Sequence, residues 1–236
     1  MKRKIFWLGH VPILGMVMLL TFFAGLIGNK TATVMAEKME TKDRHCIVID
    51  AGHGGEDGGA TSCSGIPESN FNLEISLRLE QMFRLLGYPT AMVRRSDTAV
   101  HTRGDTIAAR KASDLKERVL LANETENGLL ISIHQNYFSE SKYSGAQVFY
   151  PKTEGSKALA VALQSAFIEK LNPGSNRMAK SATGIYLMDH ITCPGVLIEC
   201  GFLSNPDEAA LLASKNYQQK VCSVVASAVS SYLSNT

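Results

Sequence analysis

Short apolar stretches rich in β-branched residues recur along the chain, and glycine or polar residues bound each of them. This pattern is typical of strands in a parallel sheet, because helices cover both faces of such a sheet and the strands need not alternate. The pattern predicts strands at residues 46–50, 90–94, 128–134, 145–150, 184–187 and 195–199.

Between these stretches the apolar residues recur at intervals of three and four, which is the spacing of a helix with one buried face. The predicted helices cover residues 68–86, part of 105–124, 158–171 and 221–232. Alternating strands and helices predict an α/β fold, with a single domain built on a mostly parallel twisted β-sheet of about six strands and helices on both faces.

The N-terminus has a different pattern, in which Lys2–Lys4 precedes an uncharged apolar run from Ile5 to Gly28. A basic flank before an apolar run is typical of an export segment. Val34–Ala36 offers a cleavage site, but the run is also long enough to stay in a bilayer. We therefore interpret residues 1–36 as a signal peptide or a membrane anchor, residues 37–44 as a linker and residues 45–236 as the extracytoplasmic domain.

The charge balance changes once this segment is set aside. The chain has 24 basic and 22 acidic residues, but four of the basic residues and none of the acidic ones lie before residue 37. The remainder carries 20 bases and 22 acids, a net charge of −2, so we expect no nucleic-acid partner. The five cysteines form no C-x-x-C pair and are predicted to be mainly buried free thiols, although a disulfide stays open.

Three of the predicted strands end at a residue with catalytic or metal-binding chemistry. His53 follows the first strand in "IVIDAGHGGEDGG", His134 ends the third in "LLISIHQN", and Glu199 ends the last. The carboxyl ends of parallel strands meet at one edge of a sheet. Two histidines at that edge indicate a metal site.

The glycines around His53 do not form a phosphate loop. G-x-G-x-x-G requires glycine where Asp57 stands, no G-K-[ST] follows, and Glu56 and Asp57 would repel a phosphate. The glycines instead leave room around His53 and permit positive φ angles.

A catalytic zinc commonly takes two histidines and one glutamate and keeps one position open. Glu68 is the best third ligand because it begins the first helix, although an acid at a helix N-terminus is also favourable without a metal. Glu74 and Glu80 lie inside that helix and are expected on its solvated face. Glu199 either marks the point where its strand reaches water or accepts a proton from the attacking water, a role that typically adds about 10²–10⁴ in rate.

Four stretches, in this order, resemble the zinc-dependent N-acetylmuramoyl-L-alanine amidases: "IVIDAGHGGEDGGA", "IPESNFNLEIS", "LLISIHQN" and "GVLIECGFLSNPDEAALL". The resemblance extends from about Cys46 to Leu233. It implies that His53, Glu68 and His134 bind one Zn²⁺ per chain and that Glu199 is the catalytic glutamate. The implied substrate is the amide between the lactyl group of muramic acid and L-alanine of the peptidoglycan stem peptide.

The short chain, apolar N-terminus and lack of wall-binding repeats resemble the spore-cortex subtype, which acts during spore formation and germination. That likeness implies a step toward muramic-δ-lactam in the space around the forespore. The expected partners are glycan strands and stem peptides, and the membrane if the N-terminal segment is not cleaved. Ligands from widely separated loops also leave an accessory activator protein open. Asp189 departs from the basic or neutral residue expected in its loop.

Two rival interpretations remain at this point. The first is a zinc carboxypeptidase acting on wall peptides, in which His53-x-x-Glu56 supplies two ligands and Glu56 replaces Glu68. The second is a non-catalytic peptidoglycan-binding protein with the same fold. We expect Arg94 and Arg95 at the solvated surface, with contact to substrate carboxylates as the alternative. The histidines expected not to bind metal are His10, His45, His101 and His190.

Overall fold

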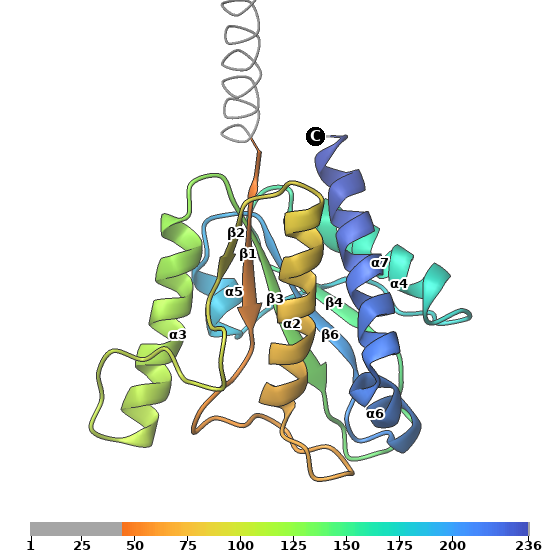
Figure 1. Ribbon diagram of the computed structural model, residues 1–236, viewed down its shortest axis with the longest axis horizontal. Coiled ribbons are helices and arrows are strands. Elements are labelled where there is room, and N and C mark those ends of the chain that lie inside the picture. The colour runs from red at the N-terminus through yellow and green to blue at the C-terminus, as the bar shows by residue number, and fades with distance from the viewer. Residues whose placement is uncertain (1–43, 236) are drawn as a thin grey trace, which may run out of the picture. The chain divides into compact units, whose positions relative to one another are not determined.

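The computed structural model describes residues 44–235, so the predicted N-terminal segment and most of the predicted linker lie outside the described residues. One sheet runs through this part of the chain in the order β2-β1-β3-β6-β4-β5 (Figure 1). Its strands are β1 (Cys46–Ala51), β2 (Thr90–Met92), β3 (Gly128–Asn136), β4 (Gln147–Tyr150), β5 (Lys180–Ser181) and β6 (Gly195–Phe202). The helices are α2 (Glu68–Leu85), α3 (Ile107–Glu124), α4 (Ser156–Lys170), α5 (Tyr186–His190), α6 (Pro206–Ala213) and α7 (Lys215–Leu233).

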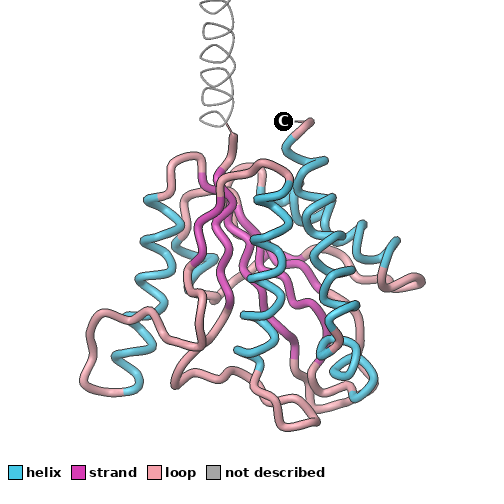
Figure 2. The backbone as a smooth tube through the Cα atoms, viewed as in Figure 1, coloured by secondary structure: helices cyan, strands magenta, loops and turns pink. Residues whose placement is uncertain are grey.

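The sheet is mostly parallel, as predicted. β1 runs parallel to β2 and β3, β3 to β6, and β4 to β5, whereas β4 and β6 are antiparallel. Figure 2 shows the strands as a layer with helices on both sides. The predicted α/β fold with six strands is therefore confirmed.

The two faces of the sheet have separate apolar cores. Ile47 and Ile49 belong to the larger core, with residues of α2, α4, α6 and α7. Val48 belongs to the smaller core, with residues of α3 and α5. Alternate residues of one strand therefore face different helices, and this explains why the strand is apolar throughout.

The predicted strand at residues 184–187 is wrong, because Tyr186–His190 forms the short helix α5. Local contacts favour the helical turn: the Tyr186 and His190 rings stack with centroids 4.0 Å apart, and the Gly184 amide donates to Asp189 at 3.0 Å. Asp189, the residue that departs from the expected pattern, thus fixes its own loop. The fifth strand is instead the two-residue β5.

The helix α6 was not predicted, although its start carries a clear signal. Asn205 accepts a hydrogen bond from the Glu208 amide at 3.0 Å, and Pro206 occupies the first turn. An asparagine N-cap followed by proline is a common helix beginning. Within the described residues, no helix is both long enough and apolar enough to cross a bilayer.

All five cysteines lie within the described residues and none forms a disulfide there. Cys200 and Cys222 are buried, Cys46 and Cys193 are partly buried, and Cys63 is exposed. Free thiols are thus found as predicted, but only two of them are fully buried.

Candidate metal centre and active site

The three predicted ligands come from three separate elements and meet at one point. Their ligand atoms, one each from His53, Glu68 and His134, lie within 4.8 Å of one another. His53 follows β1, His134 lies in β3, and Glu68 is the first residue of α2. In Figure 1 β1 and β3 both point downward, toward the end of the molecule at which α2 begins.

Glu68 is buried and hydrogen-bonded at both carboxylate oxygens. Its Oε1 accepts from His134 Nδ1 at 3.0 Å, and its Oε2 lies 3.3 Å from His53 Nε2. Burial alone raises the pKa of Glu68, but the hydrogen bonds from the two histidines outweigh burial and the net pKa is lowered. Glu68 is therefore an ionised carboxylate aimed at both imidazoles, which is more than a favourable acid at a helix N-terminus requires.

His53 has a left-handed backbone, with φ of 61°. Such a conformation is uncommon for a residue with a side chain and marks a position that its surroundings hold in place. Its Nδ1 lies 3.1 Å from Asp57 Oδ2. Burial lowers the pKa of His53, but Glu68 and Asp57 outweigh this effect and the net pKa is raised. A carboxylate on the second ring nitrogen is typical of metal-binding histidines.

Two glycines make room for these side chains. A Cβ on Gly52 would lie 2.2 Å from the His134 ring. A Cβ on Gly59 would lie 2.6 Å from Glu68 Oε2 and 2.7 Å from His53 Cδ2, and its φ is +69°. Gly52 and Gly59 are thus required because ligand side chains lie too close for a Cβ, and Gly59 also because its φ angle is positive.

Arg94 and Arg118, which we call the arginine clamp, hold the backbone on both sides of His53. Arg94 is only 3% exposed, so the predicted solvated position and the alternative substrate contact are both wrong. Its guanidinium donates to the carbonyls of Ala51 and Gly52 at 2.8 and 3.0 Å. Arg118 of α3 donates to the carbonyls of Ala51 and His53 at 3.0 and 2.8 Å.

The clamp also includes buried acids. Arg118 pairs with Asp50 at the end of β1 and, at 2.6 Å, with Asp114. Burial raises the pKa of Asp50, but the charges and hydrogen bonds of its partners, Arg118 first, outweigh it and the net pKa is lowered. Arg118 was not predicted from the sequence, although Asp50, an acid inside an apolar strand, indicates that a buried partner is required.

Two other acidic side chains of α2 were assigned to the solvated face. Glu74 is exposed, as expected. The expectation for Glu80 is wrong, because Glu80 is 3% exposed and pairs with Arg95. Arg95 is the solvated member of this pair, as expected, with its side chain 57% exposed.

Glu199 lies inside β6 and pairs in register with His134 of β3. Its Oε2 atom is buried and has no hydrogen-bond partner within residues 44–235. Burial raises the pKa of Glu199 to about 7, and the charge of Glu68 adds to the effect. A buried carboxylate oxygen without a partner is costly, and beside a group of metal ligands this partly buried glutamate has the properties of a general base.

The rival ligand Glu56 points to a different partner. Its carboxylate is bound by Arg110 through contacts of 2.9 and 2.8 Å, and its side chain is 60% exposed. His45 and His190 bind backbone carbonyls of Asn127 and Tyr186, His101 lines a cavity of about 120 Å³, and His10 lies outside the described residues. The geometry therefore favours Glu68 over Glu56.

The donor set fits a catalytic zinc. Two imidazoles and one carboxylate are a common protein ligand set for this ion, and the fourth position is then free for water or substrate. The glycines keep other side chains away from these donors, and the orphaned Glu199 oxygen lies on the neighbouring strand. Together these groups have the chemistry for metal-assisted hydrolysis.

Comparisons with known proteins agree with this chemistry. The family model described as N-acetylmuramoyl-L-alanine amidase matches residues 47–231. The germination-specific N-acetylmuramoyl-L-alanine amidase of Bacillus subtilis is 39% identical over 95% of this chain and 93% of its own. The CwlD amidase from Clostridioides difficile, solved in complex with the GerS lipoprotein, has a TM-score of 0.78 and 34% identity, covering 82% of this chain and all of that one. An amidase structure from Clostridium difficile 630 has a TM-score of 0.71 and 27% identity over 82% of this chain and 99% of its own.

Proposed function

The chain belongs to the N-acetylmuramoyl-L-alanine amidase family, and from this premise we propose that it is a zinc enzyme of the spore cortex. The bond it cuts is the amide between the lactyl group of muramic acid and L-alanine of the stem peptide. His53, Glu68 and His134 hold the zinc and Glu199 is the catalytic residue. The observation that supports this assignment best is the unpaired Glu199 carboxylate, in register with one of three clustered ligands.

A zinc ion bound here would polarise the lactyl carbonyl and lower the pKa of water. Glu199 accepts a proton as water attacks the carbonyl carbon. The C–N bond then breaks, and Glu199 returns the proton to the departing amine of L-alanine. A pKa near 7 suits a group that must both accept and donate a proton near neutral pH.

The cortex assignment is supported by the germination-specific relative, which this chain matches over nearly its full length. In that role the enzyme removes stem peptides and leaves muramic acid free for conversion to the δ-lactam. A separate deacetylase would act after it. The site of action is outside the cytoplasm, with residues 1–36 as signal peptide or anchor and residues 45–236 as the catalytic domain.

We also propose that an accessory protein assists this chain. The supporting observation is that the Clostridioides difficile relative was solved with the GerS lipoprotein bound. The ligands come from a loop, a helix and a strand, so a partner could act by holding these elements together. Zinc content measured with and without a candidate partner tests the idea, and equal content would contradict it.

The function is tested by zinc analysis and mass spectrometry of muropeptides with matched variants. Glu199→Gln should keep zinc and lose about 10²–10⁴ in rate. Glu68→Gln should lose zinc, whereas the control Glu56→Gln should keep both zinc and activity. Zinc loss in Glu56→Gln alone would favour the carboxypeptidase interpretation, and so would release of a terminal amino acid in place of the whole stem peptide. Binding of peptidoglycan with no cleavage under any condition would favour the non-catalytic interpretation.

A further inference from the structure

Three aromatic side chains stand exposed on the loop that follows β3, namely Tyr137, Phe138 and Tyr143, and the last two contact each other. Phe138 and Tyr143 are 48% and 36% exposed, and their rings meet edge to face with centroids 5.0 Å apart. The Tyr143 ring also lies 6.3 Å from that of the buried Phe202, at the end of β6. We call Phe138, Tyr143 and Phe202 the aromatic platform.

The loop that carries the platform, residues 137–146, is fixed rather than loosely connected. It is joined to residues 204–208, within the "SNPDE" stretch that begins α6. The bonds run from the Phe138 amide to Ser204 at 3.2 Å, from Asn205 to the Ser141 and Tyr143 carbonyls at 2.9 and 3.3 Å, and from the Gly145 amide to Glu208 at 2.8 Å. The fold thus holds two aromatic rings in water, where they add little to folding. An exposed apolar surface that is held rigidly indicates contact with another molecule.

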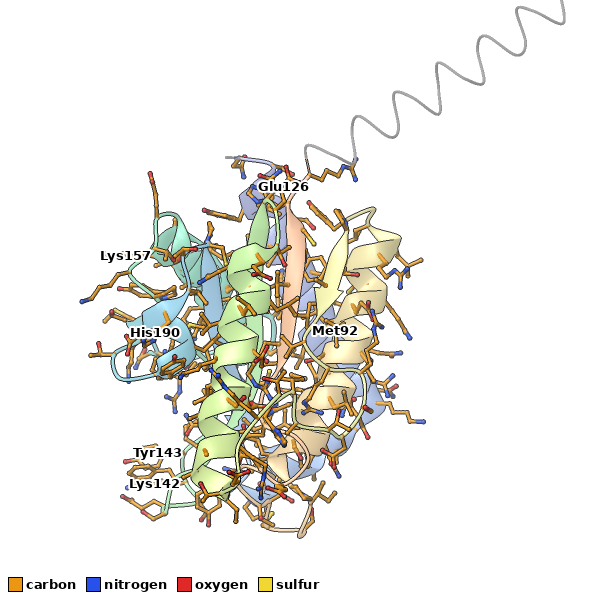
Figure 3. The ribbon with its side chains drawn as sticks, turned by 90° about the vertical axis from the view of Figure 1, so that its left-hand side faces the viewer. Met92, Glu126, Lys142, Tyr143, Lys157 and His190 are labelled. Atoms are coloured by element: carbon orange, nitrogen blue, oxygen red, sulfur yellow. The ribbon has the colours of Figure 1, made fainter. Side chains whose placement is uncertain are left out.

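The platform lies directly beyond the candidate active site. Asn136 pairs with Phe202, two residues after His134 and three after Glu199. At about 3.3 Å per residue, the platform begins roughly 7–10 Å beyond the pair formed by His134 and Glu199. Figure 3 shows Tyr143 and Lys142 at the lower left, on the same side of the molecule as His190 of α5.

The two cations beside the platform, Lys142 and Arg177, already have partners. Lys142 lies 2.6 Å from Glu140 and 5.3 Å from the Tyr143 ring centre. Arg177 stacks on Phe202 at 4.9 Å and donates to the Ser144 carbonyl. A stem peptide carries free carboxylates and would require unpaired cations, whereas a sugar ring is uncharged and presents C–H groups on its faces. The platform therefore suits a sugar better than the peptide.

We propose that Phe138 and Tyr143 bind a pyranose ring of the glycan strand, next to the muramic acid whose lactyl amide is cut. This inference rests on the proposed function, because that reaction brings a glycan strand to within a few bonds of the metal ligands. The strand continues past the reacting residue, so its next sugar lies over the surface beyond the site. Recognition of the strand then depends on neutral aromatic surface, separate from the ligands.

The test is a binding measurement that needs no cleavage. Peptide-free oligosaccharides of alternating N-acetylglucosamine and N-acetylmuramic acid are titrated calorimetrically into full-length, zinc-loaded protein. Phe138→Ser with Tyr143→Ser should weaken binding roughly tenfold, as expected for two aromatic contacts of about 0.7 kcal/mol each. The matched control is Val161→Ser on α4, which is 49% exposed and should bind like the wild type.

A second variant separates stacking from general apolar contact and guards against misfolding. Phe138→Leu with Tyr143→Leu keeps apolar side chains but has no flat ring, and it should lose binding to nearly the same extent. An unchanged dissociation constant in both double variants would overturn the proposal and leave the rings as a surface for a protein partner. Wild-type protein that binds free stem tripeptide but no oligosaccharide would also overturn it. Failure of the amidase assignment would appear separately, as intact muropeptides.

Discussion

The loop that carries His53 and the loop that carries the aromatic platform lie at the same edge of the sheet, but different forces hold them. Residues 51–53 are held by the buried guanidinium groups of the arginine clamp, which donate to their backbone carbonyls. Residues 137–146 are held at the surface, mostly by neutral hydrogen bonds with Ser204 and Asn205. One loop presents a ligand and the other presents exposed rings.

The difference follows from what each loop must do. His53 is held in a backbone conformation that costs about 1–3 kcal/mol, and a metal ligand tolerates little displacement. Only strong buried interactions keep such a residue in place. The platform need only stay ordered, so weaker contacts suffice. The comparison predicts that damage to the first loop removes metal and much stability together, whereas damage to the second leaves the metal bound and costs little stability.

Arg118→Met should have the largest effect on stability. It leaves Asp50 buried without its partner, and removing one member of a buried ion pair typically costs about 3–5 kcal/mol. Urea unfolding of the metal-free protein measures the loss, and zinc titration should show weaker binding. The control is Lys116→Met, an exposed position on the same helix. Equal unfolding of the two variants would show that the clamp does not support the loop.

Arg94→Met should cost somewhat less, about 2–4 kcal/mol, because several charge-assisted hydrogen bonds to carbonyls are lost but no acid is left unpaired. Its neighbour provides a close control. Arg95→Met removes a half-exposed side chain, and the buried Glu80 keeps Thr90 at 3.3 Å and Arg84 at 3.8 Å, so the loss should be about 1 kcal/mol. Similar losses at the two positions would contradict the distinction between the buried guanidinium of Arg94 and the half-exposed one of Arg95.

The candidate ligands and Glu199 were predictable from the sequence, whereas most of the aromatic platform was not. His53, Glu68, His134 and Glu199 follow a local rule, since each stands at or near the end of an apolar strand or the start of a helix. Their roles as ligands and base stay predictions. The predicted position of Arg94 was wrong because a charged residue after a strand is usually exposed to solvent. The carbonyl groups that Arg94 binds are brought to it only by the tertiary structure.

The platform depends on contacts between residues more than 60 positions apart, such as Phe138 with Ser204 and Asn205 with Tyr143. The spacing of apolar residues along the sequence cannot indicate contacts between residues so far apart. The short helix α5 was mistaken for a strand for a similar reason, because five residues are too few to show a helical period. The sheet was predictable because its strands are long apolar runs buried on both faces.

Glu199 lies in β6, and its replacement should raise stability, whereas the arginine substitutions lower it. Its folded pKa of about 7 is above the usual value near 4.3, so the folded state binds more protons across that range and stability falls as pH rises through it. Glu199→Gln has no carboxyl group to ionise and therefore does not lose stability in this way as pH rises. At pH 8 the metal-free variant should be about 1–3 kcal/mol more stable than wild type, with a difference that shrinks toward pH 5. Chemical unfolding with a chelator present measures it, and a difference independent of pH would contradict the assignment.

Asn205→Ala should give the smallest effect and tests whether the two loops are independent. The side chain caps α6 and also donates to the Ser141 and Tyr143 carbonyls, so its loss should cost about 1 kcal/mol. Amide hydrogen exchange should quicken in residues 137–146 and stay unchanged in residues 50–59, with zinc content at the wild-type level. Asp207→Ala, an exposed change in the same turn of α6, should leave both loops unaffected. Zinc loss in Asn205→Ala would contradict this independence and mean that the platform supports the ligands. The hydrogen bonds that order the rings would then also hold β6 and β3 in register at His134 and Glu199.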